Sequence, residues 1–284
     1  MLSRRWIVNG LLILSILLVV FIGLRLDAPS EMATEPSTKQ AANAAIGRIE
    51  IETGSASLRL AREPEGWSIV EPVHWPADRA SVERLIGIVD TGDSPPLDAG
   101  SIDLATLGLD EPVARLRIGD TGVSFGTTNN IGGRRYTMID SELYLLDDRQ
   151  IPFILQGLAG FVDRRLLPPR FELTALSLPG RELVRDKSGA WQANGSGTVD
   201  AGRLAGLAGA WQSLKATRIA AIDTADQSQA DIAATLDDGS RQQFLLLSVE
   251  PELVIANPGL GLQYHFRADL YNRLISPLDD ENPA

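Results

Sequence analysis

One stretch of the chain matches the spacing of a serine nucleophile. Gly122, Ser124 and Gly126 form a Gly-x-Ser-x-Gly pattern, which in serine hydrolases places the hydroxyl on a sharp turn between a strand and a helix. The flanking residues favour another structure. Gly119-Asp120-Thr121-Gly122 is typical of a hairpin turn, and Thr127-Thr128-Asn129-Asn130 is poor helix-forming sequence. We therefore expect Ser124 to lie within a strand.

A hydrolase or a metal enzyme would also need a base or a set of ligands. The sequence has two histidines, His74 and His265. Both have apolar or aromatic neighbours, which is the usual setting of a hydrogen-bonded structural histidine. No His-x-x-x-His or Asp-x-Asp spacing joins either one to carboxylates. The chain has no cysteine, which excludes disulfides, thiolate metal sites and cysteine nucleophiles. We predict no metal and no cofactor.

Three pairs of adjacent aspartates are the remaining acid–base candidates, at Asp147-Asp148, Asp237-Asp238 and Asp279-Asp280. A glycosidase needs two carboxylates that face one another across the substrate. Neighbours on a strand point to opposite faces, and aspartates are common in turns. We expect these pairs to shape turns, and we predict that the protein is not an enzyme.

Two groups of residues are better suited to binding than to catalysis. The loop with Gly132, Gly133, Arg134 and Arg135 offers backbone amides and two guanidinium groups to an anion. A hairpin turn with positive φ at a glycine explains the same sequence more simply. Four tryptophans could stack on sugar rings, as in a polysaccharide- or peptidoglycan-binding module, although core packing is favoured. They are Trp67, Trp75, Trp191 and Trp211.

The elements that must position these residues are predicted to occur twice along the chain. Residues 49–92 contain alternating apolar positions, a Gly-Trp pair, and an aspartate followed by an apolar stretch of helical period; residues 173–217 repeat this order. Period-two apolarity with short turns predicts antiparallel strands. Asp78 and Asp200 are placed to cap the two helices. The first of them is expected to run to about Gly92, and Pro152 can start another helix. The predicted fold class is α+β, with two similar α+β repeats that contain antiparallel sheets.

The two repeats are predicted to span residues 46–168 and 169–277, followed by a disordered acidic tail at residues 278–284. Pro168-Pro169 marks the join. At 258 residues, the chain after position 26 is long enough for one large core or two smaller ones.

The segment just before the join, Phe161–Leu167, combines apolar residues with Arg164 and Arg165. We expect it to dock one repeat against the other. A partner-binding patch built on Phe161, Arg164 and Arg165 is the alternative. Specific function is best sought in this segment, in the Gly132–Arg135 loop, or in the groove between the halves.

The first segment predicts attachment to a membrane. Residues 7–24 are apolar apart from two polar residues and two glycines, which is long enough to cross the hydrocarbon core. Arg4 and Arg5 precede this stretch, so the positive-inside rule keeps the N-terminus cytoplasmic. We predict that residues 1–26 are a cytoplasmic stub and single-pass anchor in the bacterial inner membrane, with the rest of the chain periplasmic. A cleaved signal peptide is the competing interpretation, although no small-x-small site follows.

Composition after the anchor restricts the partners. Residues 27–45 lack bulky apolar side chains and are predicted to be a flexible tether. After residue 26 the chain has 23 basic and 37 acidic residues, a net charge of −14. Such a charge repels nucleic acid and anionic lipid, so we expect no nucleic-acid partner.

The order of several short motifs resembles a known bacterial family. Gly66-Trp67 and Pro72 precede Trp75-Pro76-Ala77-Asp78; then follow Leu104-x-x-Leu107-Gly108-Leu109-Asp110-Glu111-Pro112, Arg134-Arg135-Tyr136 and Phe161-Val162-Asp163-Arg164-Arg165. This order, over about residues 47–275, is similar to that of the family called domain of unknown function 4340. Trp75 departs from the family, which often has tyrosine or another residue there.

The resemblance implies a membrane-anchored envelope protein, because members are typically of that kind and some lie beside ABC-type transporter components of the gliding-motility kind. It implies no reaction and no catalytic residue. The leading hypothesis is therefore a non-catalytic accessory subunit of an ABC-transporter-like complex, with a permease and an ATPase as partners. A polysaccharide- or peptidoglycan-binding module is the alternative, and a serine hydrolase using Ser124 is the third hypothesis.

Overall fold

A computed structural model gives the fold of the chain. It describes residues 46–54, 56–90, 94–98, 100, 103–130, 132–195, 200–223 and 230–276. The predicted anchor (1–26), tether (27–45) and acidic tail (278–284) lie outside these residues. Across the described ranges, the structure contains no helix with the length and apolar character that a membrane crossing requires.

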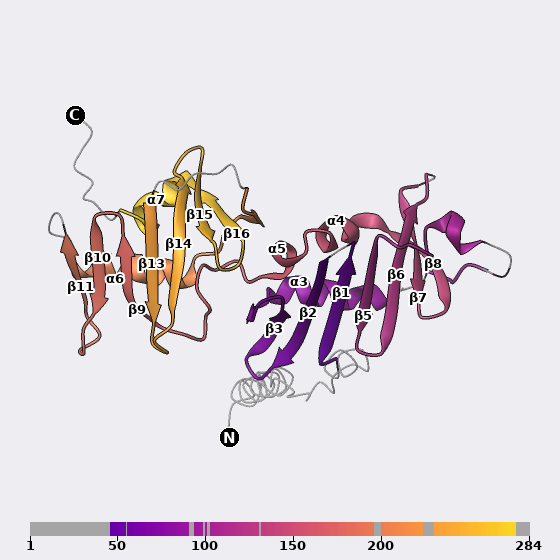
Figure 1. Cartoon of the computed structure of the whole chain (residues 1–284), viewed down its shortest axis with the longest axis horizontal. Coiled ribbons are helices and arrows are strands. Elements are labelled where there is room, and N and C mark those ends of the chain that lie inside the picture. The colour runs from indigo at the N-terminus through magenta and orange to yellow at the C-terminus, as the bar shows by residue number, and fades with distance from the viewer. Residues whose placement is uncertain are drawn as a thin grey trace, which may run out of the picture. The chain divides into compact units, whose positions relative to one another are not determined.

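The first half of the described chain forms an antiparallel sheet of eight strands in the order β4-β3-β2-β1-β5-β6-β7-β8 (Figure 1). The strands are β1 (Arg48–Thr53), β2 (Ala56–Glu63), β3 (Gly66–Glu71), β4 (Trp75–Pro76), β5 (Ala114–Ile118), β6 (Thr121–Thr128), β7 (Arg134–Ile139) and β8 (Glu142–Asp147). The helical elements of this half are α3 (Arg79–Ile86), η1 (Gly87–Val89), η2 (Leu104–Leu107), η3 (Asp148–Gln150), α4 (Ile151–Ile154) and α5 (Leu158–Phe161).

The second half forms another antiparallel sheet of eight strands, in the order β11-β10-β9-β13-β14-β15-β16-β12. Its strands are β9 (Leu173–Leu178), β10 (Arg181–Arg185), β11 (Trp191–Gly195), β12 (Arg218–Ala221), β13 (Ala230–Leu236), β14 (Arg241–Ser248), β15 (Glu252–Asn257) and β16 (Leu262–Arg267). Its helical elements are α6 (Ala201–Ser213), η4 (Ala268–Leu270) and α7 (Tyr271–Leu274).

The two sheets share one connection pattern, which confirms the prediction of two similar units with antiparallel sheets. In each, three consecutive strands pair as hairpins, a helix follows, and the next long strand returns beside the first strand of the unit. Thus β5 pairs with β1, and β13 pairs with β9. Each unit then adds a meander of three strands, followed by a 3₁₀ turn and a one-turn helix; the first unit has a second one-turn helix, α5, after these.

In both units, a described part of the connection after the helix pairs with the last strand of the sheet. In the second unit it forms β12, which pairs with the last strand, β16. In the first unit it makes a single bridge between Leu97 and Leu143 of the last strand, β8. The first unit has instead a two-residue strand, β4, at its opposite edge. The two repeats therefore differ mainly in which edge of the sheet carries the additional short strand.

Local sequence explains the main elements. In β5 the burial alternates residue by residue, with Ala114, Leu116 and Ile118 buried, as expected for a strand with one solvated face. The predicted caps are present: the Asp78 carboxylate accepts a hydrogen bond from the Ser81 amide at the start of α3, and Asp200 caps α6 in the same way. Both helices pack against their own sheets (Figure 1), and their buried apolar residues belong to the core.

Two helix predictions need correction. The helix expected to continue from Asp78 to about Gly92 ends at Ile86 and tightens into the 3₁₀ turn η1. The helix expected from Pro152 is two separate one-turn pieces, α4 and α5. Gly157 lies between them with φ of 55°, a left-handed conformation that interrupts a right-handed helix.

Candidate functional site

Ser124 lies in the middle of strand β6, where it is paired with Arg115 of β5 and Met138 of β7. The strand continues to Thr128, so the serine does not precede a helix, as a nucleophile elbow requires. Ser124 borders a shallow depression of about 160 Å³ whose lining contains no histidine. The close approach of η2 to strand β6 explains Gly126: a Cβ there would lie 2.1 Å from the Leu107 carbonyl oxygen.

Both histidines are engaged with carboxylates of their own units. His74 Nε2 lies 2.8 Å from Glu63 Oε1, and this contact is the main cause of the lowered pKa of Glu63. His265 is buried in β16, and its Nδ1 lies 3.0 Å from Glu252 Oε2 and 2.8 Å from Arg218. The same contact with His265 is the largest cause of the lowered pKa of Glu252. No hydrogen bond among the described residues joins either histidine to Ser124.

The loop at Gly132 is the hairpin turn between β6 and β7. Gly132 and Gly133 have φ of 90° and 64°, which only glycine adopts readily. The Arg135 guanidinium donates to both carboxylate oxygens of Asp148, to the Thr128 hydroxyl and to the Gly126 carbonyl.

This contact with Arg135 holds the pKa of Asp148 below its ordinary value. Arg135 is therefore committed to the fold, and Arg134 is the exposed arginine of the loop.

The four tryptophans divide into two pairs. Trp75 and Trp211 are buried, and the Trp211 indole N–H donates to the Leu274 carbonyl at 2.7 Å. Trp67 and Trp191 are half-buried and pack on the core at matching places, each opposite an arginine of the neighbouring strand. Of these four tryptophans, Trp67 and Trp191 are therefore the two that are accessible enough to stack on a sugar ring.

The segment that joins the two units forms backbone hydrogen bonds with both. On one side, Val162 bridges Ala77, and the Asp163 amide donates to the Pro76 carbonyl at 2.9 Å. On the other side, Arg165 bridges Lys215, and the Ala216 amide donates to the Arg164 carbonyl at 2.9 Å. We call residues 161–167 the junction segment. Its backbone contacts agree with the docking role expected for it.

Side-chain contacts also stabilise the junction segment. Phe161 is fully buried, with its ring 4.6 Å from that of Phe153, so it supports the fold and does not present a surface to a partner. The Asp163 carboxylate accepts hydrogen bonds from the backbone amide and the guanidinium of Arg165. This pairing raises the pKa of Arg165.

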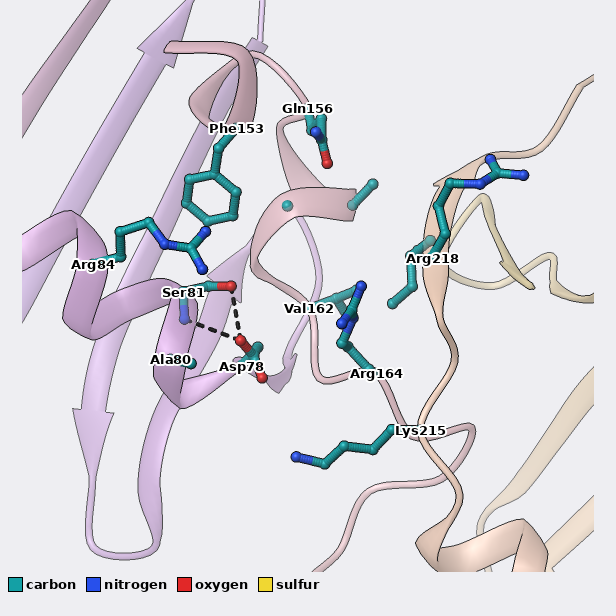
Figure 2. A pocket seen from close by; sticks show the side chains of 13 residues that line it. Asp78, Ala80, Ser81, Arg84, Phe153, Gln156, Val162, Arg164, Lys215 and Arg218 are labelled. Carbon is teal, nitrogen blue, oxygen red and sulfur yellow. Dashed lines mark hydrogen bonds between the residues drawn. The ribbon is translucent and has the colours of Figure 1, made fainter. Parts of the chain in front are cut away.

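A cavity of about 390 Å³ opens where the junction segment meets both units. Figure 2 shows the side chains around it. They come from α3, from α4 and α5, from the junction segment, and from the residues after α6. The lining residues are Asp78, Ala80, Ser81, Arg84, Phe153, Gln156, Ala159, Gly160, Val162, Arg164, Lys215, Arg218 and Ile219.

Three cations of this lining have no carboxylate partner among the described residues. The Arg84 guanidinium lies over the Phe153 ring, 4.8 Å from its centroid. Arg164 donates to the backbone carbonyl of Thr217. Lys215 makes no side-chain hydrogen bond or ion pair within the described ranges, and its chain extends along the cavity in Figure 2. We call Arg84, Arg164 and Lys215 the cation cluster.

The other charged groups of the lining are already paired. Arg218 points away from the cavity (Figure 2) and contacts Glu252 and His265. One oxygen of the Asp78 carboxylate accepts from the Ser81 amide at 3.0 Å and from its hydroxyl at 2.8 Å. The cavity is thus net positive within a chain of net charge −11, and its field attracts an anion.

The comparisons with known proteins identify the family. The chain matches the family described as domain of unknown function (DUF4340) over residues 67–237. The chain belongs to this family. No curated protein and no solved structure matches it. The resemblance inferred from the motif order is thereby confirmed, and the matched region covers most of both sheet units.

In this member of the family, the structure separates the residues predicted as a ligand or partner patch. Arg164 lies in the cavity, and Phe161 and Arg165 support it from the junction segment. Gly132, Gly133, Arg134 and Arg135 lie at the β6–β7 turn and contribute nothing to the cavity lining. Sequence reasoning missed Arg84 and Lys215 as site residues.

Proposed function

We propose that the chain is a non-catalytic accessory subunit of an ABC-transporter-like complex in the bacterial cell envelope. Residues 1–26 anchor it in the inner membrane, and the two sheet units stand on the periplasmic side. The subunit works by binding: its cavity receives a ligand, and the junction faces the permease.

One observation carries the proposal: the cation cluster converges on a cavity that both sheet units build. The groups best suited to chemistry are used elsewhere. Ser124 is a mid-strand residue, and each histidine contacts a carboxylate of its own unit. The three cations of the cavity have no carboxylate partner among the described residues, and positive charge around a concave site favours recognition over reaction. The apolar stretch of residues 7–24 supports the envelope setting.

Copurification tests this proposal. The full chain, carrying a C-terminal affinity tag, is expressed in its native host, crosslinked gently and extracted in mild detergent. We expect an ATPase and a permease in the eluate. An untagged strain is the background control. A monomer recovered without partners under these conditions would refute the accessory role.

Polysaccharide binding is the second candidate, and the matching positions of Trp67 and Trp191 favour it. Both are half-buried and lie on the outer part of their sheets, at β3 and β11. The expected result is quenching of tryptophan fluorescence by peptidoglycan fragments in the wild type and its loss in the Trp67→Phe, Trp191→Phe double variant. Unchanged quenching in that variant would exclude this mode, because Trp75 and Trp211 are buried.

A further inference from the structure

The positions of the three cations suggest what the cavity holds. Arg84 comes from helix α3 of the first unit, Arg164 from the junction segment, and Lys215 from the connection after α6 of the second unit. Three elements that are distant in sequence therefore bring like charges to one cavity. Like charges brought together repel one another, and a bound anion relieves this repulsion.

The fold holds two of these cations in defined places. Phe161 backs the Phe153 ring, and that ring carries the Arg84 guanidinium. The backbone bridge between Arg165 and Lys215 fixes the main chain from which the lysine extends, next to Arg164. Gly160 allows this close arrangement, because a Cβ there would lie 2.7 Å from the Phe153 carbonyl oxygen.

Charge balance selects the class of anion. Because Arg218 is paired with Glu252, the three remaining cations and the carboxylate of Asp78 give the cavity a net charge of +2. A phosphomonoester carries about −1.5 to −2 charges at pH 7, whereas a carboxylate carries one. Arginine forks suit the oxygens of a phosphoryl group, and lysine adds a point charge. The volume of about 390 Å³ is within the range of small-molecule sites.

We propose that this cavity binds a phosphomonoester group, with Arg84, Arg164 and Lys215 as its ligands. The inference rests on the proposed function, since it names the ligand class of the same site. The phosphoryl group belongs either to a soluble phosphate ester or to a lipid headgroup, and the apolar wall formed by Phe153, Val162 and Ile219 contacts the adjacent carbon atoms.

Calorimetric titration of the purified full chain in detergent tests the inference. The probes are glycerol 3-phosphate, phosphatidic acid dispersed in the same detergent, and glycerate as a carboxylate control. We expect one of the two phosphate probes to bind, and glycerate to bind at least tenfold more weakly. Binding of glycerol 3-phosphate assigns a soluble source, and binding of phosphatidic acid alone assigns a lipid source.

Two lysine variants make the test specific. Lys215→Gln removes a cation that makes no side-chain hydrogen bond or ion pair within the described residues, so the fold should be retained; we expect about tenfold weaker binding. Lys187→Gln removes the same charge from the exposed turn between β10 and β11, and we expect a change below about twofold. The Arg84→Gln, Lys215→Gln double variant should show no binding.

Three results would overturn the inference: no heat from either phosphate probe, equal losses in the two lysine variants, or glycerate binding as tight as that of the phosphates. Partner proteins do not enter this titration. A chain that binds phosphate but copurifies with no ATPase or permease would therefore refute the accessory role alone, and the reverse result would refute the phosphate site alone.

Discussion

Replacing Asp163 by asparagine should destabilise the protein, because this carboxylate holds the junction segment. Its side chain is 8% exposed and that of Arg165 is 28% exposed. Breaking a buried ion pair from one side costs roughly 3–5 kcal/mol. Here the partly exposed guanidinium regains some hydration, and the asparagine oxygen still accepts a hydrogen bond. We therefore expect a loss of about 2 kcal/mol, or roughly 4–8 °C in Tm.

The chain contains a matched control for this change. Asp147 accepts hydrogen bonds from the backbone amide and the guanidinium of Arg149, the same arrangement that Asp163 forms with Arg165. The side chains of this second pair are 55% and 86% exposed. Water screens such a pair, so Asp147→Asn should leave Tm nearly unchanged.

Thermal and urea unfolding of the two variants, followed by far-UV circular dichroism, provide the comparison. We expect a clear loss of stability for Asp163→Asn and almost none for Asp147→Asn. Equal midpoints for the two variants would refute it, because burial of the junction would then contribute nothing to the strength of the pair.

Two further predictions concern packing and pH. Gly126→Ala should lower the free energy of unfolding by more than about 2 kcal/mol, because the new Cβ would overlap the Leu107 carbonyl; Gly206→Ala in α6, with open space around it, should raise it by roughly 0.5–1 kcal/mol. Unfolding midpoints measure both, and a stabilising Gly126→Ala would contradict the close approach. The pKa of Asp148 is lowered in the folded state from its ordinary value of 3.8, so its stabilising contribution is present above that value and is lost as the pH falls through the folded pKa. The stability difference between wild type and Asp148→Asn should therefore be constant at neutral pH and shrink below about pH 4; a difference that grows on acidification would contradict the contact with Arg135.

Most of the secondary structure was predictable because each element has a local signal. Apolar alternation predicted β1, β2 and β5, and the caps Asp78 and Asp200 predicted the starts of both long helices. The repeated order of these signals also predicted that the units are alike. The helix expected from Pro152 failed because Gly157 adopts a positive φ, which an apolar pattern does not show.

The site was predictable only in part, for a physical reason. Arg164 was predicted as a site residue because it lies beside apolar residues at the join. The predicted duplication also indicated a groove between the two halves. Nothing in the local sequence distinguishes Arg84 or Lys215 as a site residue. Arg84 is on the polar side of helix α3, and Lys215 follows the end of helix α6. Their convergence arises from tertiary contacts of the junction segment, which the sequence pattern does not encode at short range.

The most direct test of the central claim is site-specific photo-crosslinking in living cells. A photoreactive amino acid replaces Lys215 at the cavity in one strain and Lys187 at the β10–β11 turn in another. Lys215 pairs with Arg165 of the junction segment. If a membrane partner binds at this segment, position 215 should give adducts with that partner and position 187 should give none. Adducts from position 187 alone, or identical adducts from both positions, would contradict the account.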